Sequence, residues 1–370
     1  MKIDEKRLLR EFTELVELDS LSFRERKAAD YVKGKLEELG FEVSEDDAGT
    51  QYGGNAGNVY GFLKGTLPGE TILFSSHLDT VEPGKGKRPV LSEDGRITSA
   101  GDTVLGADDV SGIVEILGGI RGVCGSGRPH RDIEVLFPVA EEVYVKGTKV
   151  FDFSKVRARE AYVLDLSGAV GAAALQAPSL LSFEITVTGR ASHAGFSPEE
   201  GIHAIAVAGS AISKIRQGRI DPETTLNIGK ITGGQATNIV PELCRCEGEI
   251  RSYSHQKALQ TAREVQSVFE AEAAGAGAEC RTEIRVDLTA YKIPREAAVV
   301  QRFERACERL GLPAHLTRTF GGSDNNTFAE QGIQGIVLSC GMYDSHSTSE
   351  YTTVTDLKRG AELVAELILQ

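Results

Sequence analysis

The sequence contains no tryptophan, and aromatic residues make up only 6% of its 370 residues. A hydrophobic core must therefore be built mainly from valine, isoleucine, leucine and alanine. No apolar run is long enough to span a bilayer, and the N-terminus lacks the apolar segment of a secretory signal. We therefore predict a cytoplasmic protein without a membrane partner, and the length favours two domains.

Basic residues are in the minority, with 41 lysines and arginines against 54 acidic residues and a net charge of -13. This balance argues against a nucleic-acid partner, which needs a basic surface, and suits a carboxylate-rich site that recruits cations. The six cysteines are too few and too scattered for a disulfide scaffold. Cys244 and Cys246 lack the second pair that a zinc knuckle needs, so we predict reduced thiols.

Two kinds of periodicity divide the chain. Strand-like apolar runs alternate with amphipathic helical patterns, which indicates an α/β fold with a mixed sheet and helices on both faces. Residues 177–290 instead read strand, helix, strand, strand, helix, strand, the order of a ferredoxin-like α+β domain. We therefore predict a catalytic domain built from 1–176 and 291–370, with a lid or dimerisation domain inserted at 177–290.

Acidic and imidazole side chains follow several of the strand-like runs. The clearest case is the pair Glu141-Glu142, which ends the apolar run 133–140. Active sites of open α/β sheets form beyond the carboxyl ends of the strands. Two imidazoles and several carboxylates make the mixed ligand set that zinc favours, with cobalt or manganese as alternatives. The candidates are His77, Asp79, Asp108, Glu141, Glu142, Asp165 and His346.

Each candidate also has a plainer explanation. Asp108 and Asp109 could simply cap the helix that follows them. The glutamate pair could be a solvated loop, and His346 could be a polar loop residue between serines. It is the joint occurrence of these groups at strand ends that indicates a metal site.

Five segments of the chain together resemble the M20 family of co-catalytic metallopeptidases, most closely its peptidase T (tripeptide aminopeptidase) branch. The likeness covers nearly the whole chain, including the inserted domain. The segments are Ser-His-Leu-Asp-Thr at 76–80, Leu-Gly-Ala-Asp-Asp at 105–109, Ala-Glu-Glu-Val at 140–143, Tyr-Val-Leu-Asp at 162–165, and the C-terminal His346.

The resemblance implies two divalent metal ions, zinc first among the choices, held ~3.5–4 Å apart. His77 and Asp165 would bind one ion, Glu142 and His346 would bind the other, and Asp108 would bridge them. The family also implies a cis peptide bond between Asp108 and the aspartate that follows it.

Two further acids receive roles from the same resemblance. Glu141 would take a proton from the attacking water and pass it to the leaving amine. Asp79 would hold the second nitrogen of the His77 imidazole. Adjacent residues on a regular strand face opposite ways, so the chain must turn at Glu141 and Glu142 to bring both to one water.

The inserted domain resembles the family's lid. His193, within Gly-Arg-Ala-Ser-His-Ala-Gly at 189–195, would reach across a homodimer interface to steady the oxyanion of the partner's substrate. Asn238 and Arg251 resemble substrate-binding positions, and Arg251 would pair with a peptide's terminal carboxylate. Gly322 lies in a turn similar to one that cradles substrate. The plainer readings are a turn asparagine and a strand-edge arginine.

The sequence departs from the family pattern near the site. Val110 stands where the family has lysine, and Tyr144 stands where it has glycine. The segment between His77 and Asp108 is also shorter than in tripeptidases, which removes a substrate-facing excursion. These departures put tripeptide specificity in question without touching a predicted metal ligand.

Three functions are compatible with these observations. The first is an aminopeptidase acting on short peptides, supported by Asp165, where family carboxypeptidases and deacylases more often have glutamate. The second is a deacylase of N-acyl amino acids, motivated by the shortened segment and by Tyr144. The third is a catalytically silent binding protein, which the intact set of catalytic positions disfavours.

Overall fold

The computed structural model describes residues 2–370, and the chain divides into two compact units. The first unit comprises the chain up to Gln176, Lys292–Thr319 and Ser323–Gln370. The second comprises Ala177–Tyr291 and Phe320–Gly322. Residues 320–322, which the sequence placed in the catalytic domain, thus group with the second unit.

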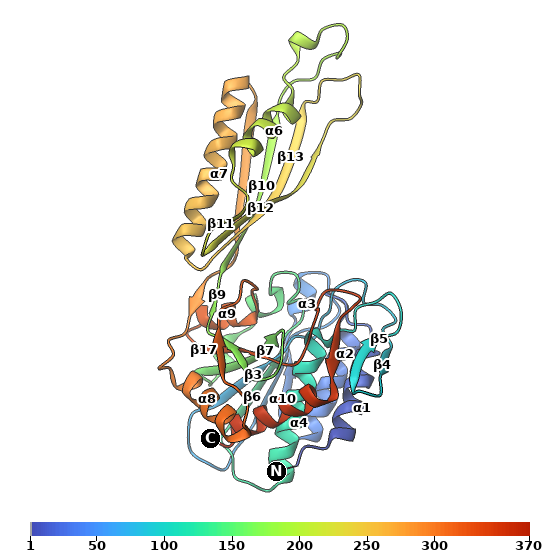
Figure 1. Cartoon of the computed structure of the whole chain (residues 1–370), viewed down its shortest axis with the longest axis vertical. Helices are drawn as coiled ribbons and strands as arrows, with labels where there is room; N and C mark the ends of the chain where they lie inside the picture. Colours follow the sequence, from blue (N-terminus) through green and yellow to red (C-terminus); the bar gives the residue numbers. More distant parts are fainter. Residues whose placement is uncertain (1) are drawn as a thin grey trace. The chain divides into compact units, whose positions relative to one another are not determined.

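The first unit is built on an eight-stranded mixed sheet in the order β1-β2-β6-β3-β7-β17-β8-β16 (Figure 1). The four neighbouring strands β6, β3, β7 and β17 run parallel to one another. Every residue of β3 and β6 is buried, as the continuous apolar runs of a buried parallel strand require. The strands are β1 Glu42–Glu45, β2 Val59–Leu63, β3 Ile72–Ser75, β6 Ile133–Phe137, β7 Glu160–Leu166, β8 Ala172–Ala174, β16 His315–Thr317 and β17 Gln334–Ser339.

Helices cover both faces of this sheet, as predicted. Tyr162 and Val163 are adjacent on β7 and therefore point to opposite faces. The hydroxyl of Tyr162 donates to the carbonyl of Val299 on α8, whereas Val163 packs in one cluster with Phe328 of α9. The principal helices are α1 Glu5–Val16, α2 Arg26–Glu38, α4 Ala107–Gly125, α8 Ala298–Leu310, α9 Asp324–Glu330 and α10 Val354–Ile368.

Smaller elements were not predicted. The segments β4 Pro89–Leu91 and β5 Arg96–Ser99 form a hairpin that pairs with β18 Tyr351–Thr353. Between the glutamate pair and β7 lie the four-residue α5 Lys146–Lys149 and the 3₁₀ turn η1 Phe153–Lys155. The short helix α3 Ala48–Gln51 lies against α5.

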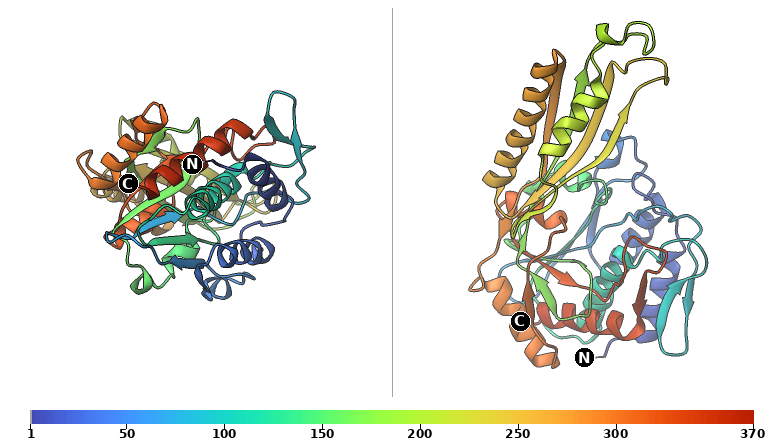
Figure 2. Two further views of the ribbon diagram at one scale, coloured as in Figure 1. Left: turned by 90° about the horizontal axis from the view of Figure 1, so that it is seen from below. Right: turned by 45° about the horizontal axis from the view of Figure 1, so that its top comes forward.

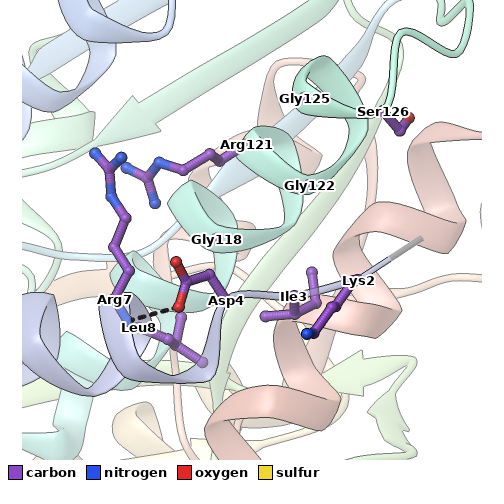
Figure 3. A pocket seen from close by; sticks show the side chains of 10 residues that line it. All are labelled: Lys2, Ile3, Asp4, Arg7, Leu8, Gly118, Arg121, Gly122, Gly125 and Ser126. Carbon is purple, nitrogen blue, oxygen red and sulfur yellow. Dashed lines mark hydrogen bonds between the residues drawn. The ribbon is translucent and has the colours of Figure 1, made fainter.

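A buried carboxylate joins α1 to its neighbours. Glu11 is fully buried, and its oxygens accept hydrogen bonds from Arg7 and Arg121, both at 2.9 Å. The two arginines lie side by side next to a cavity of about 290 Å³ between α1 and α4 (Figure 3). None of the predicted site residues lines this cavity.

The second unit is a ferredoxin-like α+β domain, as predicted. Its sheet has the order β11-β12-β13-β10-β14, and the four long strands are antiparallel neighbours. The helices α6 and α7 pack against each other and against this sheet around one apolar cluster (Figure 2). The elements are β10 Ser179–Thr188, α6 Ala204–Lys214, β11 Gly218–Asp221, β12 Thr224–Gly233, β13 Leu243–Ser252, α7 His255–Ala276 and β14 Glu279–Leu288.

Among residues 2–370, no helix combines the length and the apolar character needed to cross a membrane.

Candidate metal centre

Four of the five predicted metal ligands come from the carboxyl ends of neighbouring parallel strands. His77 lies two residues beyond the end of β3, and Asp165 stands near the end of β7. Glu142 and His346 follow β6 and β17 on longer loops, and Asp108 opens α4. These ends share one edge of the sheet, which is where the sequence placed the site.

Asp108 lies between the two imidazoles. Its Oδ1 is 3.1 Å from Nε2 of His77, and its Oδ2 is 3.3 Å from Nε2 of His346. Each imidazole has a second carboxylate beside it, Asp165 at 3.9 Å from His77 and Glu142 at 3.0 Å from His346. Two histidine–carboxylate pairs thus share one central carboxylate, the arrangement that the resemblance to the M20 family implies for two metal ions.

Further carboxylates crowd the same space. Potential ligand atoms of His77, Glu141 and Asp165 lie within 4.8 Å of one another, and the same holds for His77, Asp108 and Glu142. Imidazole nitrogens and carboxylate oxygens in such groups suit zinc and similar divalent ions. The donor set therefore fits a metal centre, and the Glu141 carboxylate lies among its donor atoms.

The charges of the site show why a cation belongs there. Burial raises the pKa of Glu141 and of Asp165 well above the ordinary value. Hydrogen bonds to Asp108 and Glu142 raise the pKa of His346 to about 10. Although burial opposes its ionisation, hydrogen bonds from the two imidazoles lower the pKa of Asp108 below the ordinary value. Several carboxylates are buried close together, and divalent ions would supply the positive charge that offsets their negative charge.

Asp79 contacts both the His77 imidazole and the glutamate pair. The Nδ1 of His77 lies 2.9 Å from the main-chain carbonyl of Asp79 and 3.6 Å from its carboxylate. The carboxylate also accepts hydrogen bonds from the main-chain N–H groups of Glu141 at 2.9 Å and Glu142 at 3.2 Å. Asp79 therefore links the orientation of the imidazole to that of the glutamate pair.

The backbone departs from regular structure at both acidic pairs. Ala140 has φ of 54°, so the chain leaves the extended conformation before Glu141 and Glu142, as predicted. The peptide bond between Asp108 and Asp109 is cis, which confirms the expectation from the family.

Glu350 is a site residue that sequence reasoning missed. It is 1% exposed, and its two carboxylate oxygens accept hydrogen bonds from the main-chain N–H groups of Gly106 at 2.7 Å and Asp108 at 2.9 Å. It lies four residues after His346 and therefore links the loops that carry two predicted ligands. An acidic residue so close to a candidate ligand was the available signal.

Asp109 also holds the segments next to the site in place through hydrogen bonds. Its Oδ2 accepts the main-chain N–H of His77 at 3.2 Å, and Cys340 donates its thiol to Oδ1 at 3.7 Å. Ser76 donates to the main-chain carbonyl of Asp109 at 2.9 Å. The second aspartate of the pair thus anchors β3 and β17 to α4, and one of its carboxylate oxygens also lies within 4.8 Å of potential ligand atoms of Asp108 and Asp165.

Comparisons with known proteins identify the family of the chain. The peptidase dimerisation domain of the M20 family matches residues 177–276, and the peptidase family M28 description matches residues 58–194. The protein YqjE of Bacillus subtilis is 38% identical, and the match covers 99% of this chain and 98% of that protein.

Two solved structures are similar over nearly their full length. The aminopeptidase PepT of Bacillus cereus is 37% identical with a TM-score of 0.92, and a tripeptidase of Staphylococcus aureus is 33% identical with a TM-score of 0.96. In both cases the match covers 99% of this chain and 98% of the other. The chain belongs to the M20 family of peptidases, in its peptidase T branch.

In this M20 peptidase, the two residues that depart from the family pattern lie in different environments. Val110 is buried in the first turn of α4, where it packs in the core. Tyr144 is 43% exposed and has φ of 72°. That left-handed conformation costs glycine nothing and costs a side-chain-bearing residue free energy, which accounts for the glycine expected there.

The predicted lid residues of the M20 dimerisation domain lie in the second unit. His193 is exposed, and its Nδ1 accepts the main-chain N–H groups of Gly195 and Phe196, both at 3.1 Å. In the neutral ring the proton therefore sits on Nε2, a donor. Asn238 is exposed, and its main-chain carbonyl accepts the main-chain N–H of Ala194 at 3.0 Å. Asn238 therefore lies beside the His193 loop.

Arg251 is already engaged within the second unit. Its guanidinium donates to both carboxylate oxygens of Glu249, at 2.8 and 3.2 Å, and to the carbonyl of Phe320 at 2.9 Å. The last contact draws the turn that contains Gly322 against β13. A substrate carboxylate would have to replace Glu249 as the bidentate partner of this arginine.

Proposed function

We propose that this M20 peptidase removes the N-terminal residue from short peptides at a dinuclear zinc centre, with Glu141 as general base. The observation that carries the proposal is the position of Asp108, whose two oxygens each face a different histidine. His77 and Asp165 would hold one ion, and Glu142 and His346 the other. Cobalt and manganese are alternatives to zinc with the same donor preferences.

When bound, the two ions supply Lewis-acid activation of water and polarise the scissile carbonyl. The carboxylate of Glu141 takes a proton from the attacking water as the new C–O bond forms. It then delivers that proton to the amine nitrogen as the C–N bond breaks. Asp79 holds the main-chain N–H groups of both glutamates, which keeps the base and the neighbouring ligand in register.

For the second unit we propose the family's lid role and a homodimer. The protonated Nε2 of His193 suits a donor to an oxyanion. Asn238, Arg251 and Gly322 remain predicted substrate contacts. The match to a peptidase dimerisation domain supports the homodimer.

A panel of substrates tests the proposed reaction. We expect the zinc-loaded enzyme to hydrolyse di- and tripeptides with a free N-terminus and to leave their N-acetylated forms intact. Removing the metal with a chelator should abolish the activity, and added zinc should restore it. Preference for N-acyl amino acids would instead establish the deacylase, and bound metal without hydrolysis of any substrate would establish the silent binding protein.

A further inference from the structure

A lysine without an ion-pair partner lies against two aromatic rings near the glutamate pair. The ammonium of Lys146 is 5.3 Å from the ring centroid of Phe23 and 5.4 Å from that of Tyr52. Among residues 2–370, no carboxylate lies within ion-pair distance of it. The ring faces attract the cation, but they leave its N–H donors without an acceptor.

The lysine and one of the rings are both tied to the residue that precedes Glu141. The main-chain N–H of Lys146 donates to the carbonyl of Ala140 at 3.0 Å. The N–H of Ala140 donates at 3.0 Å to the carboxylate of Glu25, and the same oxygen accepts the N–H of Phe23 at 2.7 Å. The cluster of Phe23, Tyr52 and Lys146 is thus built onto the chain segment that carries the predicted base.

The aromatic part of the cluster is held in an unusual conformation. Phe23 has φ of 70°, which is rare for a bulky residue and is found where surrounding structure enforces it, often at functional sites. Arg24 donates to the carbonyl of Phe23 at 2.7 Å and to that of Gly53 at 3.1 Å. This arginine fastens the loop of Tyr52 to Phe23, so the two rings, whose centroids are 6.5 Å apart, are fixed beside each other.

The charge of this cluster contrasts with its surroundings. The chain carries a net charge of -13, and the nearby predicted ligands and base are acidic. Because the backbone of Lys146 is hydrogen-bonded to the residue that precedes Glu141, its ammonium can offer a bound substrate a positive contact that the acidic donor cluster cannot. A carboxylate is the group that best fills its free donors, and the rings supply an apolar wall for the carbon chain next to that carboxylate.

We propose that Lys146, with Phe23 and Tyr52, forms a subsite that binds a carboxylate of the peptide substrate. The inference rests on the proposed peptidase function and adds a substrate class to it. The carboxylate can be the C-terminus of a short peptide or an acidic side chain. If it is the C-terminus, the subsite also sets the length of peptide that the enzyme accepts.

The test compares Lys146→Met with the wild type on four substrates: trialanine, trialanine amide, Ala-Glu-Ala amide and Ala-Gln-Ala amide. We expect the KM of the variant to rise about tenfold or more for a substrate with the recognised carboxylate. This is the expected effect of losing one charge-assisted hydrogen bond. The value of kcat should not change, since the contact is made equally in ground and transition states. An increase for trialanine alone identifies the C-terminus, and an increase for the glutamate peptide alone identifies a side chain.

Two controls separate the subsite from other effects. Lys146→Arg keeps the charge over the rings and should retain a KM close to that of the wild type. Lys155→Met removes an exposed lysine of η1 and should leave every KM unchanged. The subsite is refuted if Lys146→Met has wild-type KM for all four peptides, or if KM or kcat changes equally for peptides without a carboxylate.

The two proposals fail in different ways. If the wild-type enzyme hydrolyses no peptide with a free N-terminus, the proposed function is wrong. If the wild type is active and Lys146→Met matches it on all four substrates at an unchanged melting temperature, the subsite alone is wrong.

Discussion

Replacing Glu141 with glutamine is expected to lower kcat by about 10²–10⁴-fold, the usual contribution of a general base. The amide keeps the size of the side chain and still fits between its neighbours, but it cannot take a proton from water. The main-chain N–H of residue 141 still donates to Asp79 in the variant, so the loop should keep its conformation. The measurement is steady-state hydrolysis of a tripeptide by metal-loaded wild type and variant.

The metal content of the same variant decides between two roles for this glutamate. Its carboxylate lies among the donor atoms of His77 and Asp165, so a ligand role is geometrically possible. As a base, Glu141→Gln should bind the same number of zinc ions as the wild type. Glu142→Gln, one residue further along, is the matched control and should lose an ion. Loss of an ion from Glu141→Gln, or full activity in that variant, would contradict the assigned role.

Replacing Glu350 with glutamine should weaken zinc binding by about 10–100-fold, the usual cost of removing a group that orients a metal ligand. The glutamate accepts the N–H groups of Gly106 and Asp108 with separate oxygens. Glutamine has one oxygen and presents its NH₂ to the other N–H, so the loop that carries the central carboxylate loses a fixed position. Activity should fall at limiting zinc and recover as zinc is raised.

Glu115→Gln is the matched control for this experiment. Glu115 is also fully buried, but neither of its oxygens has a hydrogen-bond partner. This variant should bind zinc as the wild type does. A merely structural role for Glu350 would lower the melting temperature of the metal-free protein without changing zinc affinity. That outcome would remove Glu350 from the site.

The donor cluster was predictable because it depends on local patterns joined by one topological rule. Parallel strands bring their carboxyl ends to one edge, so His77, Asp165 and His346 could be brought together from sequence. The turn at Glu141 followed from the requirement that two adjacent acids face one point. The ferredoxin-like order of the second unit followed from strand and helix periodicity over long segments.

What escaped prediction depends on contacts between distant segments or on short elements. Glu350 reaches main-chain groups more than 240 residues away in the chain, a pairing that no local pattern reveals. The second contact of the His77 imidazole, with the main-chain carbonyl of Asp79 at 2.9 Å, depends on the path of the backbone after β3 and not on a side-chain pattern. The hairpin of β4 and β5 had a signal in its Asp94-Gly95 turn. Helix α9 had one in Ser323, which caps it.

The number of zinc ions bound per chain tests the central claim most directly. Elemental analysis of zinc-loaded protein after dialysis should give two ions for the wild type. His77→Ala and His346→Ala should each retain one, because each histidine belongs to a different ion, while Asp108→Ala should lose affinity for both. A single ion in the wild type, or the loss of the same ion from both histidine variants, would contradict a dinuclear centre bridged by Asp108.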